Sequence, residues 1–93
     1  MWELFGVLHG SREGRVRAVE AIQARWPGSN LWHHHYGKFT DITLHTDMPP
    51  EEAGERFWAA VSGCVDAGTL VELSICPTVA DPVYGWERRS EPG

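Results

Sequence analysis

The sequence predicts an α+β domain with the element order β-α-β-β-α-β. Three observations support this prediction: four short segments alternate apolar and other residues with a period of two, two segments between them repeat apolar residues at helical spacing, and two of the β-prone runs meet at a glycine. In this order, two helices pack on one face of a four-stranded antiparallel sheet. The opposite face is then left to water, to the C-terminal segment or to a partner.

The first strand is expected at residues 2–9. Apolar side chains occupy both phases of the alternation there, since Leu4 and Leu8 lie on one side while Phe5 and Val7 lie on the other. This pattern predicts a central strand that is covered on both faces.

A helix is expected next, from the capping residue Ser11 to Trp26, and Pro27-Gly28 ends it. Its predicted inner stripe consists of Val16, Val19, Ile22 or Gln23, and Trp26. The charged side chains that we expect to point outward are Arg12, Arg15, Arg17 and Glu20.

Residues 31–48 are expected to form a β-hairpin around Gly37-Lys38. Glycine at the first position of a two-residue loop predicts a type II′ turn, because glycine adopts a positive φ without steric cost. A single strand through the whole segment is the competing interpretation, but a glycine in mid-strand argues against it. The hairpin register pairs Tyr36 with Phe39, His34 with Asp41 and Trp32 with Thr43.

The two sides of this hairpin differ in chemistry. One side is aromatic and titratable and carries Trp32, His34, Tyr36, Phe39, Asp41, Thr43 and His45; the other carries Leu31, His33, His35, Thr40, Ile42 and Leu44. We expect the aliphatic side to face the helices, because the reverse would bury the Asp41 carboxylate among aromatic rings. The aromatic side would then lie on the open face.

A second helix is expected to begin at Pro49-Pro50-Glu51-Glu52 and to end at Gly68. Proline is tolerated in the first helical turn, and acidic residues suit the N-terminal end of the helix dipole. The predicted inner stripe is Ala53, Phe57, Ala60, Val61 and Cys64. The last strand is expected at residues 70–76, with Val71, Leu73 and Ile75 on one side.

These elements place residues 1–76 in one domain of the ferredoxin-like, split β-α-β type. Residues 77–93 form a C-terminal tail that we expect to dock on the domain, because tails are ordered mainly when they dock. The tail contains Val79, Val83, Tyr84 and Trp86. It could therefore also cover the aromatic side of the hairpin, and the sequence leaves both states of the open face possible.

The composition indicates an acidic folded protein, with a formal net charge of −5. This charge argues against general binding to nucleic acid, which requires clustered cations. Arginine far exceeds the single Lys38, as is typical of some bacteria and their viruses. The N-terminal apolar stretch is too short for a signal sequence or a membrane span, so we expect a cytoplasmic chain with no membrane partner. Cys64 and Cys76 are expected to remain free thiols.

The histidines allow a metal site as an alternative, because imidazole is the commonest protein ligand of zinc, nickel and copper. His33 and His35 project to one side of a strand and His34 to the other. At most two of these three can converge on one site, so a third ligand must come from His9, His45 or a carboxylate. The alternative site consists of His9, His34 and His45, or of His34, Asp41 and His45. The sequence lacks CxxC and HExxH spacings, so no metal or other cofactor is expected, and His34 is expected to pair with Asp41.

Motifs for nucleophilic catalysis and phosphate binding are missing. Ser11 lacks a Gly-x-Ser-x-Gly context, and the segment Gly10–Gly14 has neither a Walker lysine nor a GxGxxG pattern. The run Gly6-Val7-Leu8-His9-Gly10-Ser11-Arg12 resembles the end of the first strand in the small cobalt and iron chelatases of tetrapyrrole synthesis. The resemblance implies a role in metal delivery for His9 alone. The rest of the chain departs from that family, because it is short, has a hairpin in place of a parallel strand and shows no second half.

Three functions remain as hypotheses. The favoured one is a small non-enzymatic protein-interaction module, a regulator or a virus-encoded modulator of a host protein, because tryptophan is enriched at binding hot spots and the chain has five. Its expected contact residues are Trp32, His34, Tyr36, Phe39, Asp41, His45, Trp58 and Trp86. The alternatives are a metal-handling or chelatase-like enzyme that uses His9 and the hairpin histidines, and a self-association domain that forms a homodimer.

Overall fold

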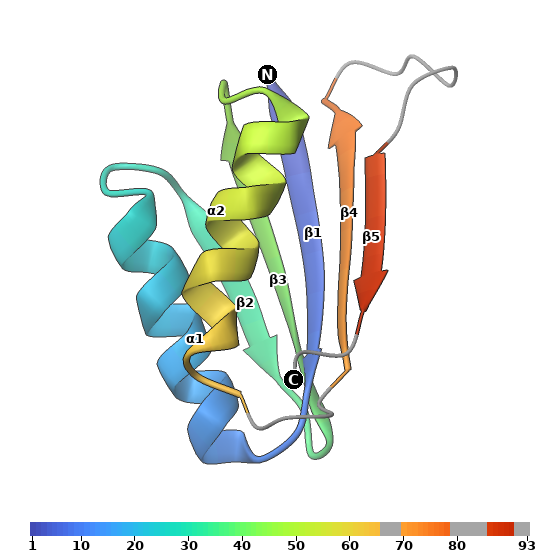
Figure 1. Ribbon diagram of the computed structural model, residues 1–93. Helices are drawn as coiled ribbons and strands as arrows, with labels where there is room; N and C mark the ends of the chain where they lie inside the picture. Colours follow the sequence, from blue (N-terminus) through green and yellow to red (C-terminus); the bar gives the residue numbers. More distant parts are fainter. Residues whose placement is uncertain (66–69, 79–85, 91–93) are drawn as a thin grey trace.

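A computed structural model of the 93-residue chain describes residues 1–65, 70–78 and 86–90 (Figure 1). The elements follow in the order β1 (Trp2–His9), α1 (Arg12–Arg25), β2 (Leu31–His35), β3 (Phe39–Thr46), α2 (Pro50–Ser62), β4 (Val71–Pro77) and β5 (Trp86–Ser90). The predicted α+β class is confirmed, and a fifth strand follows the six predicted elements.

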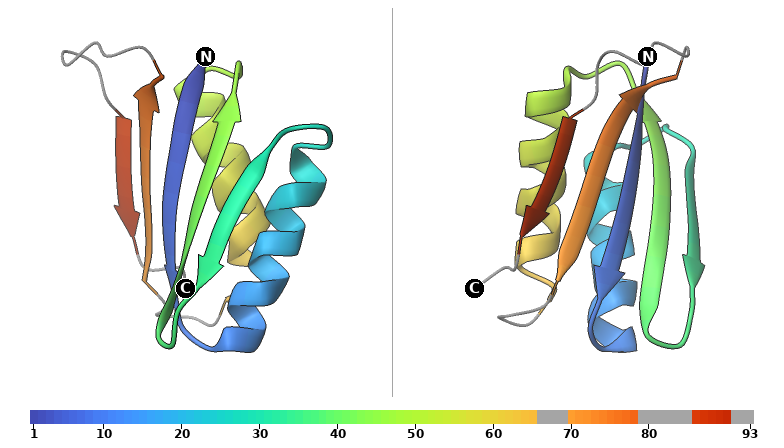
Figure 2. Two further views of the ribbon diagram at one scale, coloured as in Figure 1. Left: turned by 180° about the vertical axis from the view of Figure 1, so that it is seen from behind. Right: turned by 90° about the vertical axis from the view of Figure 1, so that its right-hand side faces the viewer.

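The strands form one antiparallel sheet in the order β2-β3-β1-β4-β5. β1 lies in the middle and pairs with β3 on one side and with β4 on the other, whereas β2 and β5 lie at the two edges. The predicted four-stranded antiparallel sheet is therefore present as β1 to β4. β5 arises from the segment expected to be a docked tail, and it extends the sheet beside β4 (Figure 2).

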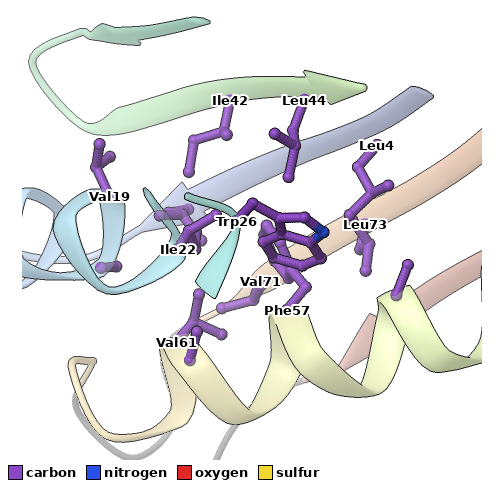
Figure 3. Packing of buried hydrophobic residues seen from close by; sticks show 14 of the residues in the cluster. Leu4, Val19, Ile22, Trp26, Ile42, Leu44, Phe57, Val61, Val71 and Leu73 are labelled. Carbon is purple, nitrogen blue, oxygen red and sulfur yellow. The ribbon is translucent and has the colours of Figure 1, made fainter. Parts of the chain in front are cut away.

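Both helices lie on the same face of the sheet, in front of the strands in Figure 1 and behind them in the left view of Figure 2. The hydrophobic core lies between the sheet and the helices and is formed by side chains from both layers (Figure 3). It includes Leu4, Leu8, Val19, Ile22, Trp26, Ile42, Leu44, Phe57, Val61, Val71, Leu73 and Ile75. Strand residues of the other phase point away from the core. The alternation of side chains along each strand thus gives the sheet one face that is buried under the helices and one face that neither α1 nor α2 covers.

α1 begins at the predicted cap, where the Ser11 hydroxyl accepts a hydrogen bond from the Gly14 amide at 3.2 Å. Its inner side differs from the prediction: Val16 is only half-buried, and the buried residues are Gly14, Arg15, Ala18, Val19 and Ile22. The predicted outward orientation is correct for Arg12, Arg17 and Glu20 but wrong for Arg15. Arg15 can be buried because its guanidinium finds oxygen acceptors on the neighbouring hairpin.

α2 begins with Pro50 as predicted, and its buried side contains the expected Ala53, Phe57, Ala60 and Val61. The helix ends at Ser62, before the predicted Gly68, because Gly63 already interrupts it and forms the C-cap. Gly68 lies outside the described residues.

Gly6 lets α2 approach the middle of the sheet. A Cβ atom at this position would lie 2.7 Å from Cζ of Phe57, which is buried between β1 and α2. Carbon atoms in favourable contact are separated by about 3.5–4.0 Å, so a side chain at Gly6 would displace the Phe57 ring.

The hairpin has the predicted register, since β2 and β3 pair Trp32 with Thr43 and His34 with Asp41. The predicted type II′ turn is wrong, because Gly37 does not adopt a positive φ. The carbonyl oxygens of Tyr36 and Gly37 both accept hydrogen bonds from Arg15. This contact with α1 accounts for a turn geometry that the loop sequence does not specify.

The orientation of the hairpin is also as predicted. Thr40, Ile42 and Leu44 face the helices and are buried, while Trp32 and Tyr36 on the opposite side are 52% and 43% exposed. Phe5 in β1 is 43% exposed, so the prediction that β1 is covered on both faces is wrong. Both helices lie on the same side of β1, and its other side therefore remains accessible.

Candidate functional site: the open face of the sheet

The open face is the side of β1 to β4 that points away from both helices. It combines aromatic rings, imidazoles and carboxylates. Its members are Glu3, Phe5, Val7 and His9 from β1; Trp32 and His34 from β2; Tyr36 from the turn; Phe39, Asp41, Thr43 and His45 from β3; and Glu72, Ser74 and Cys76 from β4.

A row of stacked rings lies at the hairpin end of this face. Tyr36 stacks on Phe39 with ring centroids 4.6 Å apart, and the centroid of the His34 imidazole lies 4.7 Å from that of the Tyr36 ring. Trp32 and Phe5 add two further exposed rings. Monomeric proteins rarely expose grouped apolar rings unless the rings contact something, so this group is a candidate binding surface.

Two histidine–carboxylate contacts lie at opposite ends of β1. His45 Nε2 is 3.0 Å from Glu3 Oε2, and the Trp32 ring meets the His45 ring edge-on at 5.4 Å. At the other end, His9 Nε2 is 3.4 Å from Glu72 Oε2. These contacts hold the polar side chains of the open face in place around the aromatic rings.

Asp41 lies between these ends, and its environment differs from the prediction. The register places Asp41 opposite His34 on β2 and opposite Val7 on β1. Within the described part of the chain, however, the Asp41 carboxylate makes no hydrogen bond or ion pair, and the predicted pair with the His34 side chain is not formed. The His34 ring lies against Tyr36 instead. Asp41 is half-buried, and the exposed part of its carboxylate can accept hydrogen bonds from a ligand.

The charges on β1 to β4 all have one sign, apart from the histidines. The only acidic residues of these strands are Glu3, Asp41 and Glu72, and all three lie on the open face. The same four strands contain no lysine and no arginine. On β1 to β4, the open face therefore carries a negative charge when its histidines are neutral, and the register of β5 pairs Arg89 with Glu72 and Glu87 with Ser74.

Arg15 anchors the β2–β3 hairpin, which forms part of the open face, to α1. Its side chain is only 2% exposed and donates to the carbonyl oxygens of Gly10 at 3.0 Å, Tyr36 at 2.8 Å and Gly37 at 3.0 Å, and to the Thr40 hydroxyl at 3.1 Å. The guanidinium thus links the β1–α1 loop to the turn that positions Tyr36. A turn held in this way fixes the position of the Tyr36 ring.

His33 and His35 lie on the side of β2 that faces α1, and their rings are 5.1 Å apart. His35 Nδ1 is 2.7 Å from the Thr40 hydroxyl, which also accepts from Arg15. Burial lowers the pKa of His35 first, and the nearby His33, Arg12 and Arg15 lower it further. A neutral His35 fits this environment, since the Thr40 hydroxyl can then donate its own proton to Nδ1.

The alternative metal site is not assembled. His9 and His45 lie at opposite ends of the open face, opposite Phe39 and Glu3 respectively, and the His34 ring packs on Tyr36. Among the described residues, no three His, Cys, Asp or Glu side chains are placed to share a metal ion. Cys64 and Cys76 are free, as expected.

The two predicted contact residues outside the hairpin are not part of the open face as described. Trp58 belongs to α2, in the helical layer, where it packs partly buried against the core. Trp86 is the first residue of β5, and its side chain lies outside the described part of the chain. The other six predicted residues, Trp32, His34, Tyr36, Phe39, Asp41 and His45, all lie on one face.

A cleft of about 680 Å³ adjoins the open face at its His45 end. It lies between the turn after α1 and the start of α2, where Asp47 and Glu52 line it and no lysine or arginine does. The Met1 ammonium also lines the cleft and lies 4.0 Å from Asp47, so the cleft contains charges of both signs.

Two residues important to the face were missed by the sequence analysis. The alternation of β1 predicts a covered position for Phe5, although Phe5 lies on the accessible side of β1. The charge of Arg15 predicts a surface position, whereas its spacing to Val19, Ile22 and Trp26 follows the helical repeat and indicates the inner side, where Arg15 lies. Hydropathy alone favours the surface for any arginine.

Neither α1 nor α2 is long and apolar enough to span a membrane, and no other helix occurs in the described residues. No protein-family model, no curated protein and no solved structure matches the chain.

Proposed function

We propose that this chain is a small non-enzymatic interaction module that binds another protein through its open face. The observation that carries the proposal is the group of exposed rings, Phe5, Trp32 and Tyr36, on a face that neither helix covers. Tryptophan and tyrosine are enriched at binding hot spots because they provide a large contact area with few rotatable bonds. A regulator, or a modulator encoded by a virus, fits such a surface.

The dimensions of the open face support this role. Four strands about 4.8 Å apart and a central strand rising about 3.3 Å per residue give a projected area of roughly 500 Å². A standard protein–protein interface buries roughly 800 Å² of accessible surface per partner, and accessible surface exceeds projected area because side chains protrude. The open face is therefore large enough to form most of one interface.

We also propose that the fold belongs to the ferredoxin-like, split β-α-β type. The supporting observations are the antiparallel order β2-β3-β1-β4 and the position of both helices on one face. In this arrangement β2 is an edge strand, and an edge strand offers unpaired backbone groups to a second copy. Self-association through β2 is therefore the second candidate function.

The test is a selection of peptides from a random displayed library on the full chain. Selected peptides are then measured against Trp32→Ala and Tyr36→Ala, with Gln23→Ala, an exposed change on α1, as the matched control. The proposal predicts that most selected peptides lose binding to both open-face variants and keep binding to the control. Peptides that bind all variants equally would contradict the proposed function. Light scattering tests the second candidate: a dimer that persists in Trp32→Ala would favour association through the β2 backbone.

A further inference from the structure

We infer that the open face receives a basic polypeptide segment, in which an arginine side chain pairs with Asp41 and stacks on the neighbouring rings. This inference rests on the proposed function, because it names the chemical class of the partner for the same surface. It follows from the charge of the face, from the unpaired state of Asp41 and from the geometry of the rings around that residue.

Charge complementarity is the first step. Strands β1 to β4 contribute Glu3, Asp41 and Glu72 to the open face and contribute no lysine or arginine. Complementary charge steers partners together and rejects partners of the same sign. A basic segment is thus attracted to this face, whereas a nucleic-acid phosphate backbone is repelled.

The second step is the state of Asp41. Glu3 is in contact with His45, and Glu72 is in contact with His9. The Asp41 carboxylate, in contrast, makes no hydrogen bond or ion pair with any described residue, even though His34 lies opposite it. Its carboxylate therefore keeps its acceptor positions for an incoming donor.

The third step is the geometry around that carboxylate. Phe39 and Thr43 flank Asp41 on the same strand and the same face. The Tyr36 ring stacks on the Phe39 ring with centroids 4.6 Å apart. A guanidinium is planar, donates two parallel hydrogen bonds to a carboxylate and stacks on aromatic faces. A lysine ammonium lacks both the fork and the flat surface, so this combination of groups favours arginine over lysine.

A second copy of this chain is a poorer occupant. Two open faces that met directly would bring their acidic residues together, and like charges in an interface are costly. Lys38, the only cation of the hairpin, is an exposed loop residue and makes no ion pair with Asp41. Direct contact between two open faces is therefore unfavourable, and the occupant that we propose is a segment of a different molecule.

The experiment compares three capped peptides that differ only in one repeated residue, which is arginine, lysine or glutamine, between glycine and leucine. Their affinities for the full chain are measured by fluorescence anisotropy. We expect the arginine peptide to bind several-fold more tightly than the lysine peptide, and added salt to weaken both. We expect Asp41→Asn to weaken the arginine peptide about tenfold, as for loss of a charged hydrogen bond, and to leave the glutamine peptide unchanged.

The matched control is Asp47→Asn, since Asp47 is an exposed carboxylate outside the open face, and this variant should bind as the wild type does. Equal affinity for the arginine and glutamine peptides, equal loss with both Asp variants, or tight binding of a single-stranded oligonucleotide would overturn the inference. If one of these results occurred but Trp32→Ala abolished binding of all peptides, the proposed function would stand and only the inference about a basic partner would fail. If Trp32→Ala changed nothing, both would fail.

Discussion

Replacing Arg15 with methionine tests whether a buried guanidinium holds the hairpin to α1. Methionine has a similar length and fills much of the same space but cannot donate a hydrogen bond. The substitution leaves the carbonyl oxygens of Gly10, Tyr36 and Gly37 and the Thr40 hydroxyl without the donor that they share. The expected result is a large loss of stability, centred on the turn.

The magnitude follows from two opposing contributions. Hydrogen bonds that involve a charged group stabilise by about 1.5–3 kcal/mol each, and Arg15 makes four. Burial of the guanidinium itself costs several kcal/mol, which the substitution recovers. Water can also reach the partly buried carbonyls in the variant. We therefore expect Arg15→Met to lower the free energy of unfolding by about 3 kcal/mol, a large part of the total for a small domain.

Urea unfolding followed by tryptophan fluorescence measures this change. The control is Arg17→Met on the same helix, because Arg17 is largely exposed and its contact with Glu13 is a 3.9 Å surface pair, so we expect a change of about 0.5 kcal/mol or less. Arg15→Lys should fall between the two, since one ammonium group cannot span all four acceptors. Equal stability of Arg15→Met and Arg17→Met would refute the role of Arg15.

Three further predictions concern stability. Because the pKa of His35 is lowered in the folded chain, the unfolded chain binds a proton at this histidine first as the pH falls. The free energy of unfolding should therefore stay constant at pH values above the ordinary histidine pKa of 6.5 and decrease at pH values below it. His35→Gln should reduce this decrease between about pH 7.5 and about pH 5 in urea titrations, and an unchanged slope would refute the assignment. Gly6→Ala should cost about 1–3 kcal/mol, because its Cβ would lie 2.7 Å from Phe57; a neutral result would show that α2 packs differently. Trp32→Ala should cost about 0.5 kcal/mol or less, whereas Phe57→Ala should cost about 3 kcal/mol or more; similar losses in thermal unfolding would mean that Trp32 belongs to the core.

The sequence was sufficient to predict the hairpin register and its orientation. Alternation with a period of two fixes which residues share a side, and Ile42 and Leu44 fix which side is dry. This is why six of the eight predicted contact residues lie together on one face. The loop residues Gly37-Lys38 did not predict the turn type, because Arg15, more than twenty positions away in the chain, binds the turn carbonyls.

Other features depend on side-chain packing that no local pattern encodes. The register predicted His34 opposite Asp41, but it could not show that the His34 ring would lie against Tyr36 and leave the carboxylate unpaired. The same pattern made Phe5 a core residue, because an apolar residue in a central strand is usually covered on both sides. Its exposure follows from the placement of both helices on one face.

The central claim, that the open face is a binding surface for a basic segment, is tested most directly by nuclear magnetic resonance. The isotope-labelled full chain is titrated with the capped arginine peptide, and the backbone and indole signals are followed. We predict that the changes concentrate at Phe5, Trp32 and Asp41 while the signals of α1 and α2 stay constant, and that Asp41→Asn weakens the response. Changes centred on α2 around Trp58, or no change at millimolar peptide, would contradict the claim.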